Sequence, residues 1–99
     1  MNIIESNIEL ICVLCIKYNV KHLYAFGSVL TDRFQSESDV DLIVDFNNID
    51  LYDYADNYFD FKGELEKLFE RDVDLLEVSA IKNPYLRQTI EASKQLIYG

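Results

Sequence analysis

Residues 39–46 constrain the fold of this chain more than any other segment. Every even-numbered position in this run is apolar, whereas Asp39, Asp41 and Asp45 occupy odd-numbered positions. Because side chains alternate between the two faces of a β-strand, this pattern predicts a strand with one apolar face toward a core. The same strand then carries Asp39 and Asp41 together on its other face.

On either side of this strand, the hydrophobic periodicity alternates between that of helix and that of strand. Apolar residues recur at helical spacing near the N-terminus, and again in an aromatic-rich stripe from Tyr54 to Phe69. The dipeptide Asn83-Pro84 is a typical helix start, since Asn is a good N-cap and Pro suits the first turn. The predicted helices are 3–18, 51–70 and 83–97, with a short helix or turn at 29–34. The predicted strands are 22–26, 39–46 and 72–78.

We therefore expect an α/β (α+β) fold with a small mixed three-stranded sheet flanked by about four helices, in the order α-β-α-β-α-β-α. Residues 35–38 are expected to form a polar loop. On the last helix, the residues expected to face the core are Leu86, Ile90, Ser93 and Ile97.

The composition limits the class of protein. Ninety-nine residues, 49% of them hydrophobic, suit one domain spanning 1–99 with a modest core. Eighteen acidic and nine basic residues give a net charge of −9, and the basic residues are scattered. Non-specific nucleic-acid binding depends on clustered Lys and Arg, so a DNA-binding module or a template-dependent polymerase is disfavoured and a basic protein partner fits better.

The sequence shows no signal-peptide pattern and no apolar run long enough to span a bilayer, so we expect a cytoplasmic protein without a membrane partner. Cys12 and Cys15 have the spacing of a redox motif or half a zinc site. Because they lie in an apolar helical pattern with no second cysteine pair, we interpret them as small core side chains in a reducing compartment.

Three acidic residues form the candidate catalytic group. Asp39 and Asp41 share one strand face, and Asp74 lies on the predicted strand 72–78. Three convergent carboxylates repel each other unless a cation or a proton neutralises them, and hard divalent cations prefer oxygen ligands. We expect Asp39 and Asp41 to hold Mg²⁺, with two ions, while Asp74 acts as a general base or shares a metal.

The turn Gly27-Ser28 precedes Asp39 by a ten-residue spacer and follows a predicted strand. Gly lets the backbone approach a phosphate closely because it has no Cβ. A helix that starts at Ser28 would direct free N–H groups at the same phosphate, and the Ser28 hydroxyl adds a further donor. We therefore expect Gly27 and Ser28 to bind the phosphates of a nucleotide.

This pattern resembles the nucleotidyltransferase superfamily typified by DNA polymerase beta, and in particular its minimal (MNT) branch. The family pattern Gly-Ser-x10-Asp-x-Asp is present at Gly27-Ser28 and Asp39-Val40-Asp41, and a third carboxylate is present in Val73-Asp74-Leu75-Leu76. The flanking Phe26, Val29 and Leu30 and the C-terminal segments Asn83-Pro84-Tyr85 and Ile97-Tyr98-Gly99 also match, so the resemblance spans nearly the whole chain.

The resemblance implies transfer of a nucleoside monophosphate, AMP from ATP, to a hydroxyl group. It also implies that Asp39 and Asp41 bind the metals and that Asp74 is the third carboxylate. Many MNT proteins are encoded beside a HEPN-domain ribonuclease toxin and act as its antitoxin by moving AMP onto a tyrosine of the toxin. The resemblance therefore implies a HEPN toxin as the partner of this chain.

The sequence departs from the family pattern in one respect. Many relatives place an Arg in the first turn after Gly-Ser, where this chain has Val29, Leu30 and Thr31. Arg33 is the first basic residue after the turn and is the candidate phosphate ligand, with Lys62 and Arg87 as alternatives from elsewhere in the chain.

Several alternatives stay open at the sequence level. Asp39 and Asp41 could be solvated acids on an edge strand. The chain could neutralise its partner by binding alone, without catalysis, or it could adenylylate a small molecule. Some residues of the cluster around Tyr52, Tyr58 and Phe59 could stay exposed and contact a partner.

Overall fold

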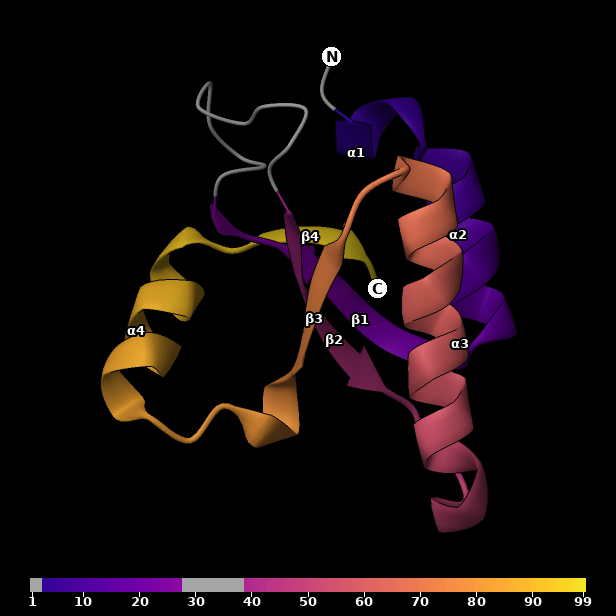
Figure 1. The fold of residues 1–99 in the computed structure, drawn as a ribbon. Helices are drawn as coiled ribbons and strands as arrows, with labels where there is room; N and C mark the ends of the chain where they lie inside the picture. Colours follow the sequence, from indigo (N-terminus) through magenta and orange to yellow (C-terminus); the bar gives the residue numbers. More distant parts are fainter. Residues whose placement is uncertain (1–2, 28–38) are drawn as a thin grey trace.

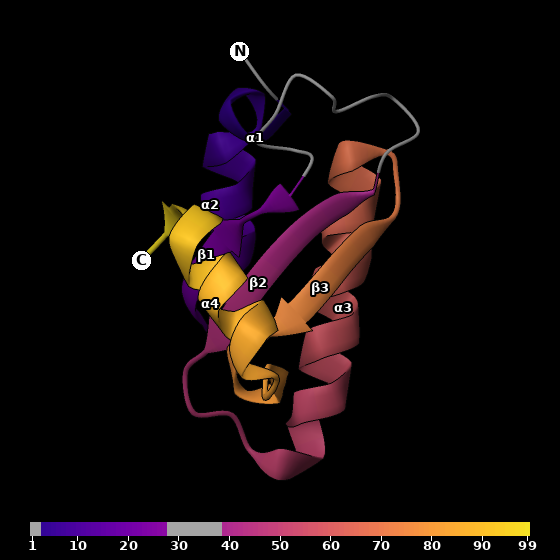
Figure 2. The same cartoon turned by 90° about the vertical axis from the view of Figure 1, so that its left-hand side faces the viewer.

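The computed structural model describes residues 3–27 and 39–99. Four strands form one sheet in the spatial order β3-β2-β1-β4, as Figure 2 shows. β1 (Val20–Ala25) pairs antiparallel with both β2 (Val40–Phe46) and β4 (Gln95–Tyr98), whereas β3 (Val73–Glu77) pairs parallel with β2. Helices α2 (Ile8–Lys17) and α3 (Leu51–Phe69) cover one face, and α4 (Pro84–Ser93) covers the other (Figure 1).

The alternation predicted for residues 39–46 is confirmed by β2. Val40, Leu42 and Val44 are buried in the larger core cluster, together with residues of α2 and α3. Ile43 on the opposite face is also buried, in a smaller cluster with Ile81 and Ile90 beneath α4. On the α4 side of the sheet, the middle of β2 is therefore covered at Ile43. Asp41 and Asp45, on the same face of β2, lie toward the two ends of the strand.

The predicted helix 51–70 is confirmed as α3, which runs over 19 residues. Asp50 caps it, because its side chain accepts a hydrogen bond of 3.1 Å from the backbone N–H of Tyr52. Phe61, Leu65 and Phe69 are buried at helical spacing, as the aromatic and apolar stripe predicts. The helix ends where Glu70 adopts a positive φ of 56°.

The expectation of three strands is wrong, because the C-terminal residues form β4 instead of continuing the last helix. α4 stops at Ser93, and Lys94 takes an extended conformation (ψ 149°). Leu96 and Tyr98 then pair with Tyr24 and Leu23 of β1. Satisfying the free backbone groups along the edge of β1 outweighs one more helical turn.

The burial expected for the last helix is correspondingly only partly right. Ile90 is buried, whereas Leu86 and Ser93 are exposed and Ile97 is half-buried on β4. Its start is as predicted, since the Asn83 side chain accepts hydrogen bonds from the N–H groups of Tyr85 (2.9 Å) and Leu86 (3.3 Å).

The predicted helix 3–18 is divided at Asn7 into α1 (Ile3–Ser6) and α2. The Asn7 side-chain amide donates a hydrogen bond to the carbonyl of Ile3 (2.9 Å), a local side-chain bond of the kind that competes with a regular helix. The short helix or turn predicted at 29–34 and the loop predicted at 35–38 lie outside the described residues. In the part of the chain that is described, none of the helices is both long and apolar enough to cross a membrane.

Candidate active site

Asp41 and Asp74 are direct register partners on the parallel strands β2 and β3. Partners in a parallel pair point to the same face, and neighbouring strands lie about 4.8 Å apart. The two carboxylates are therefore adjacent on the α4 side of the sheet. The parallel pairing follows from the chain connection, because the 19-residue helix α3 carries the chain back to the start of the sheet.

The three predicted carboxylates differ in environment. Asp41 is half-buried, whereas Asp39 and Asp74 are exposed. Burial raises the pKa of the Asp41 carboxyl above its usual range, and the nearby charges of Asp74 and then Asp39 raise it further. Among the three acids, Asp41 is therefore the one whose carboxyl pKa is raised by the other two.

Gly27 lies against the Asp41 carboxylate. The strand pairing continues past β1, since the Phe26 N–H donates to the Asp41 carbonyl (3.2 Å), and Gly27 then turns with a φ of +76°. A Cβ at Gly27 would lie only 2.7 Å from the Asp41 Oδ2 atom. Both the backbone conformation and the lack of space therefore require Gly here. Ser28 and Arg33 lie outside the described residues.

The carboxylates supply hard oxygen donors of the kind that Mg²⁺ prefers. Among the described residues, no three His, Cys, Asp or Glu side chains form a group that could hold a metal by themselves. Mg²⁺ is usually bound by one or two protein carboxylates and completed by water and substrate phosphate. Asp39 and Asp41 fit that mode of binding, in which the metal arrives with the nucleotide.

Lys62 and Arg87, the two alternatives to Arg33 as phosphate ligand, lie on opposite sides of the sheet. Lys62 lies on α3, which packs against the face of the sheet opposite to Asp41. Arg87 lies on α4, on the same side of the sheet as Asp41, but its guanidinium donates to the carbonyl of Ile81 (3.2 Å). Neither residue makes a described contact with the carboxylates.

Two tyrosines of α3 form hydrogen bonds to β3, and the sequence did not predict these contacts. The Tyr58 hydroxyl donates to the carbonyl of Leu75 (2.5 Å), the residue after Asp74, and the Tyr54 hydroxyl donates to the Glu77 carboxylate. Burial raises the pKa of Tyr58, and the charges of Glu77 and then Asp74 raise it further. The sequence signal for these contacts is the four-residue spacing of Tyr54 and Tyr58, which places both on one face of the helix. By contrast, Tyr52 and Phe59 are exposed.

The comparisons with known proteins agree with this architecture. Residues 8–99 match the family described as "Polymerase beta, Nucleotidyltransferase". Two Methanocaldococcus jannaschii proteins, each named "putative protein adenylyltransferase" (MJ1379 and MJ0128), are 35% and 38% identical to this chain over 82 residues. The matched segment is 83% of this chain and 79% of each relative.

Solved structures share the fold at lower identity. A "putative minimal nucleotidyltransferase" superposes with a TM-score of 0.77 and 24% identity, covering 96% of this chain and 95% of the other. A complex of a tri-AMPylated Shewanella oneidensis HEPN toxin with its MNT antitoxin matches with a TM-score of 0.66 and 20% identity, covering 97% and 72%. On the sequence match and the fold together, the chain belongs to the polymerase beta-type nucleotidyltransferase family.

Proposed function

We propose that this chain transfers AMP from ATP to a tyrosine hydroxyl of a HEPN-domain toxin and thereby acts as its antitoxin. The relatives named as protein adenylyltransferases support a protein acceptor. An antitoxin of the same fold, crystallised with an AMPylated HEPN toxin, supports the choice of partner. ATP as the substrate and two free thiols support the cytoplasm as the compartment.

In this proposal, residues 1–99 act as one domain, and Asp39 and Asp41 would hold two Mg²⁺ ions for the nucleotide. The bound metal would neutralise phosphate charge and favour departure of pyrophosphate. Gly27 brings the backbone against the Asp41 carboxylate; next to it, Ser28 donates a hydrogen bond to the phosphates, and Arg33 supplies a positive charge.

Asp74 acts as the general base. Its exposed carboxylate takes the proton from the tyrosine hydroxyl as that oxygen attacks the α-phosphorus of ATP. The bond from the α-phosphorus to the bridging oxygen of the β-phosphate breaks, and pyrophosphate leaves with that oxygen. The products are an AMP-tyrosine phosphodiester and pyrophosphate, so the atoms of both substrates are accounted for.

The proposal rests on the surroundings of Asp41. Asp41 lies beside Asp74 in the parallel register, and Gly27 contacts the Asp41 carboxylate so closely that a Cβ would not fit. Solvated acids on an edge strand do not need a Gly with a positive φ beside them. The arrangement combines a backbone turn that passes close to Asp41 with a pair of carboxylates on one face of the sheet.

The direct test is to incubate the chain with α-labelled ATP, Mg²⁺ and a HEPN-domain toxin, the first candidate being the product of the neighbouring gene. We expect label on toxin tyrosine, and loss of more than about a thousandfold in rate for the Asp39→Asn/Asp41→Asn variant. Asp56→Asn, an exposed acid on α3, is the matched control and keeps full activity. Equal labelling by the double variant and the wild type would refute the mechanism.

A second candidate is an antitoxin that works by binding alone, and it is favoured by the lack of a basic residue at 29–31. Rescue of cells from the toxin separates the two functions. Full rescue by Asp39→Asn/Asp41→Asn would favour binding, whereas loss of rescue with retained complex formation would favour catalysis. Adenylylation of free hydroxyl compounds without any toxin present would instead indicate a small-molecule acceptor.

A further inference from the structure

Helix α2 is apolar on almost all of its sides, although only one side is buried. Eight of its ten residues are apolar, the exceptions being Glu9 and Lys17. Ile11 and Cys15 face the core, whereas Leu10, Val13 and Ile16 are 56%, 59% and 68% exposed. Helices that are apolar all round are normally covered on all sides. In the described parts of the chain, nothing covers the outer side of α2.

The exposed side of α2 is symmetric about Val13. Leu10 and Ile16 lie three residues before and after Val13, and Glu9 and Lys17 lie four residues before and after it. A two-fold axis at Val13 that runs two α2 helices antiparallel would bring Leu10 of one chain level with Ile16 of the other. The same operation brings the acidic Glu9 level with the basic Lys17, so the surface is complementary to itself.

The charge of this surface favours another copy over a basic partner. The whole chain carries a net charge of −9, but the charges of Glu9 and Lys17 on α2 cancel. A basic protein would be attracted to the acidic remainder of the surface and not to α2. Two copies that meet at α2 bring together a helix whose own two charges cancel.

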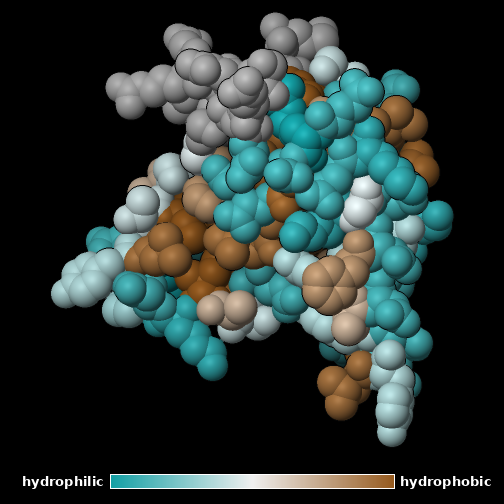
Figure 3. Space-filling model, in the orientation of Figure 1, coloured by the Kyte–Doolittle hydropathy of each residue, from teal (hydrophilic) through white to brown (hydrophobic). Residues whose placement is uncertain are grey.

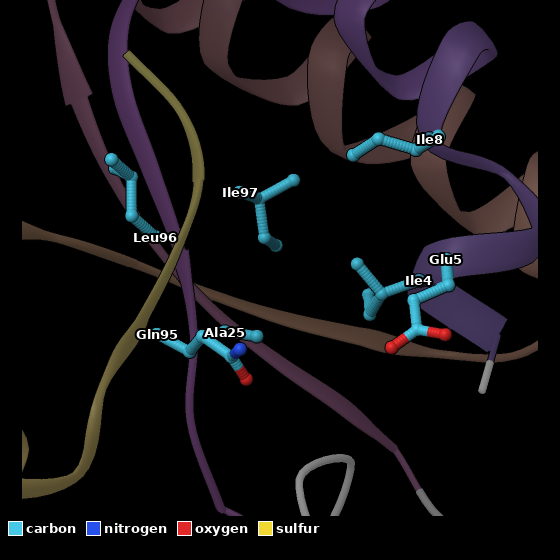
Figure 4. Close-up of a pocket in the computed structure, with 7 residues that line it drawn as sticks. All are labelled: Ile4, Glu5, Ile8, Ala25, Gln95, Leu96 and Ile97. Carbon is cyan, nitrogen blue, oxygen red and sulfur yellow. The ribbon is translucent and has the colours of Figure 1, made fainter. Parts of the chain in front are cut away.

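The surroundings of α2 extend the apolar surface. On the α3 side, Leu10, Val13 and Leu68 line a groove of about 290 Å³, whose lining also includes Glu64 and Lys67. On the β4 side, Ile8 and Leu96 line an apolar pocket of about 210 Å³ (Figure 4). Figure 3 shows apolar atoms at the upper right edge of the molecule, where α2 lies in Figure 1. Side chains from a second copy have hollows to fill on both flanks of the helix.

We propose that α2 is a two-fold interface, through which two copies of this chain pack antiparallel with Val13 on the axis. Leu10 and Ile16 form the apolar contacts next to the axis, and the Glu9 and Lys17 side chains set the antiparallel direction. The interface lies on the α2 and α3 side of the sheet, whereas Asp41 and Asp74 lie on the α4 side. Both sites of the dimer therefore stay open to nucleotide and toxin.

The test is sedimentation equilibrium of the full chain, whose monomer mass is 11.6 kDa. An interface of one helix per chain is small, so the concentration series should run from roughly 1 to 300 μM. We expect a monomer–dimer equilibrium, weakened by about tenfold or more in Val13→Asp, which places two like charges on the axis. Leu51→Asp, an equally radical change at an exposed position on α3, is the matched control and leaves the equilibrium unchanged.

Charge reversal tests the antiparallel direction. Glu9→Lys alone and Lys17→Glu alone should each weaken the dimer, because each places like charges level with one another. Mixing these two variants, or combining both changes in one chain, should restore it. A wild-type chain that stays monomeric throughout the series, or a dimer insensitive to Val13→Asp, would overturn the proposal. So would a monomer whose Val13→Asp variant no longer binds the toxin, since α2 would then be the toxin surface.

Discussion

At the scale of single residues, Gly27 is a position next to the candidate site where the structure leaves no space for a side chain. Its φ of +76° costs other residues roughly 1–2 kcal/mol, and a Cβ would lie 2.7 Å from the Asp41 Oδ2 atom. We therefore expect Gly27→Ala to lose that much unfolding free energy in urea denaturation and to lose AMP transfer as well. A Gly27→Ala protein with wild-type stability and activity would show that the close approach to Asp41 is unimportant.

Cys15 is a second residue whose surroundings lead to a prediction. Burial raises the pKa of its thiol from 9.0 to about 12, and the neighbouring Cys12 contributes less. Because the folded-state pKa is the higher one, the neutral thiol stabilises the fold below pH 9, and this contribution is lost as the pH rises toward 12. In a Cys12→Ala background, Cys15 should react with a disulfide reagent at pH 8 on the order of a hundredfold more slowly when folded than in urea. Equal rates would refute the burial of its thiol.

At the scale of elements, α3 contains a glycine without a structural reason inside the described chain. No heavy atom lies within 4 Å of a Cβ built at Gly63, and the position is in the helix interior. Gly63→Ala should therefore raise the unfolding free energy by about 0.5–1 kcal/mol without affecting AMP transfer. Thermal denaturation of Gly63→Ala and Gly27→Ala compares the same substitution at a position with space for a Cβ and at one without. A melting temperature of Gly63→Ala below that of the wild type would contradict the prediction.

The start of α4 depends on one cap. The Asn83 side chain accepts hydrogen bonds from two backbone N–H groups, those of Tyr85 and Leu86. Asn83→Ala should destabilise the fold by about 1 kcal/mol, and Asn83→Asp should retain most of the stability because a carboxylate caps equally well. Urea titrations of the two variants would show whether the cap, and not the side-chain volume, is responsible.

At the scale of the whole molecule, metal and nucleotide should stabilise the fold through the carboxylates. The half-buried Asp41 carboxylate, next to the charges of Asp74 and Asp39, makes the metal-free site unfavourable, so a ligand that neutralises it binds the folded state selectively. A non-hydrolysable ATP analogue with Mg²⁺ at 100 times its Kd should add about 2.7 kcal/mol. Chelation of the metal should remove this gain in stability, and the Asp41→Asn variant should not show the gain. Without metal, Asp41→Asn should be at least as stable as the wild type, because the variant lacks the unfavourable charge. A thermal shift that survives chelation or Asp41→Asn would place the ligand elsewhere.

The sequence by itself determined the elements that carry the site. Alternation predicts which residues of 39–46 face the larger core, because it depends only on local geometry. The Gly-Ser and Asp-x-Asp motif carries the resemblance to the family, which the match over residues 8–99 confirms. The wrong expectations concern residues whose structure depends on distant partners. Residues 95–98 continue a helical pattern, yet they pair with the edge of β1, which no local signal reveals.

Only the tertiary structure decided how the site is assembled. A pattern of apolar and polar positions says that Asp74 lies on a strand, but it does not give the register that pairs this residue with Asp41. The crossover through α3, held by Tyr58 against Leu75, decides that pairing, and the continuation of β1 past Phe26 brings Gly27 against the Asp41 carboxylate. Register and close approach arise from contacts between segments far apart in the chain, and those contacts exist only once the sheet has formed.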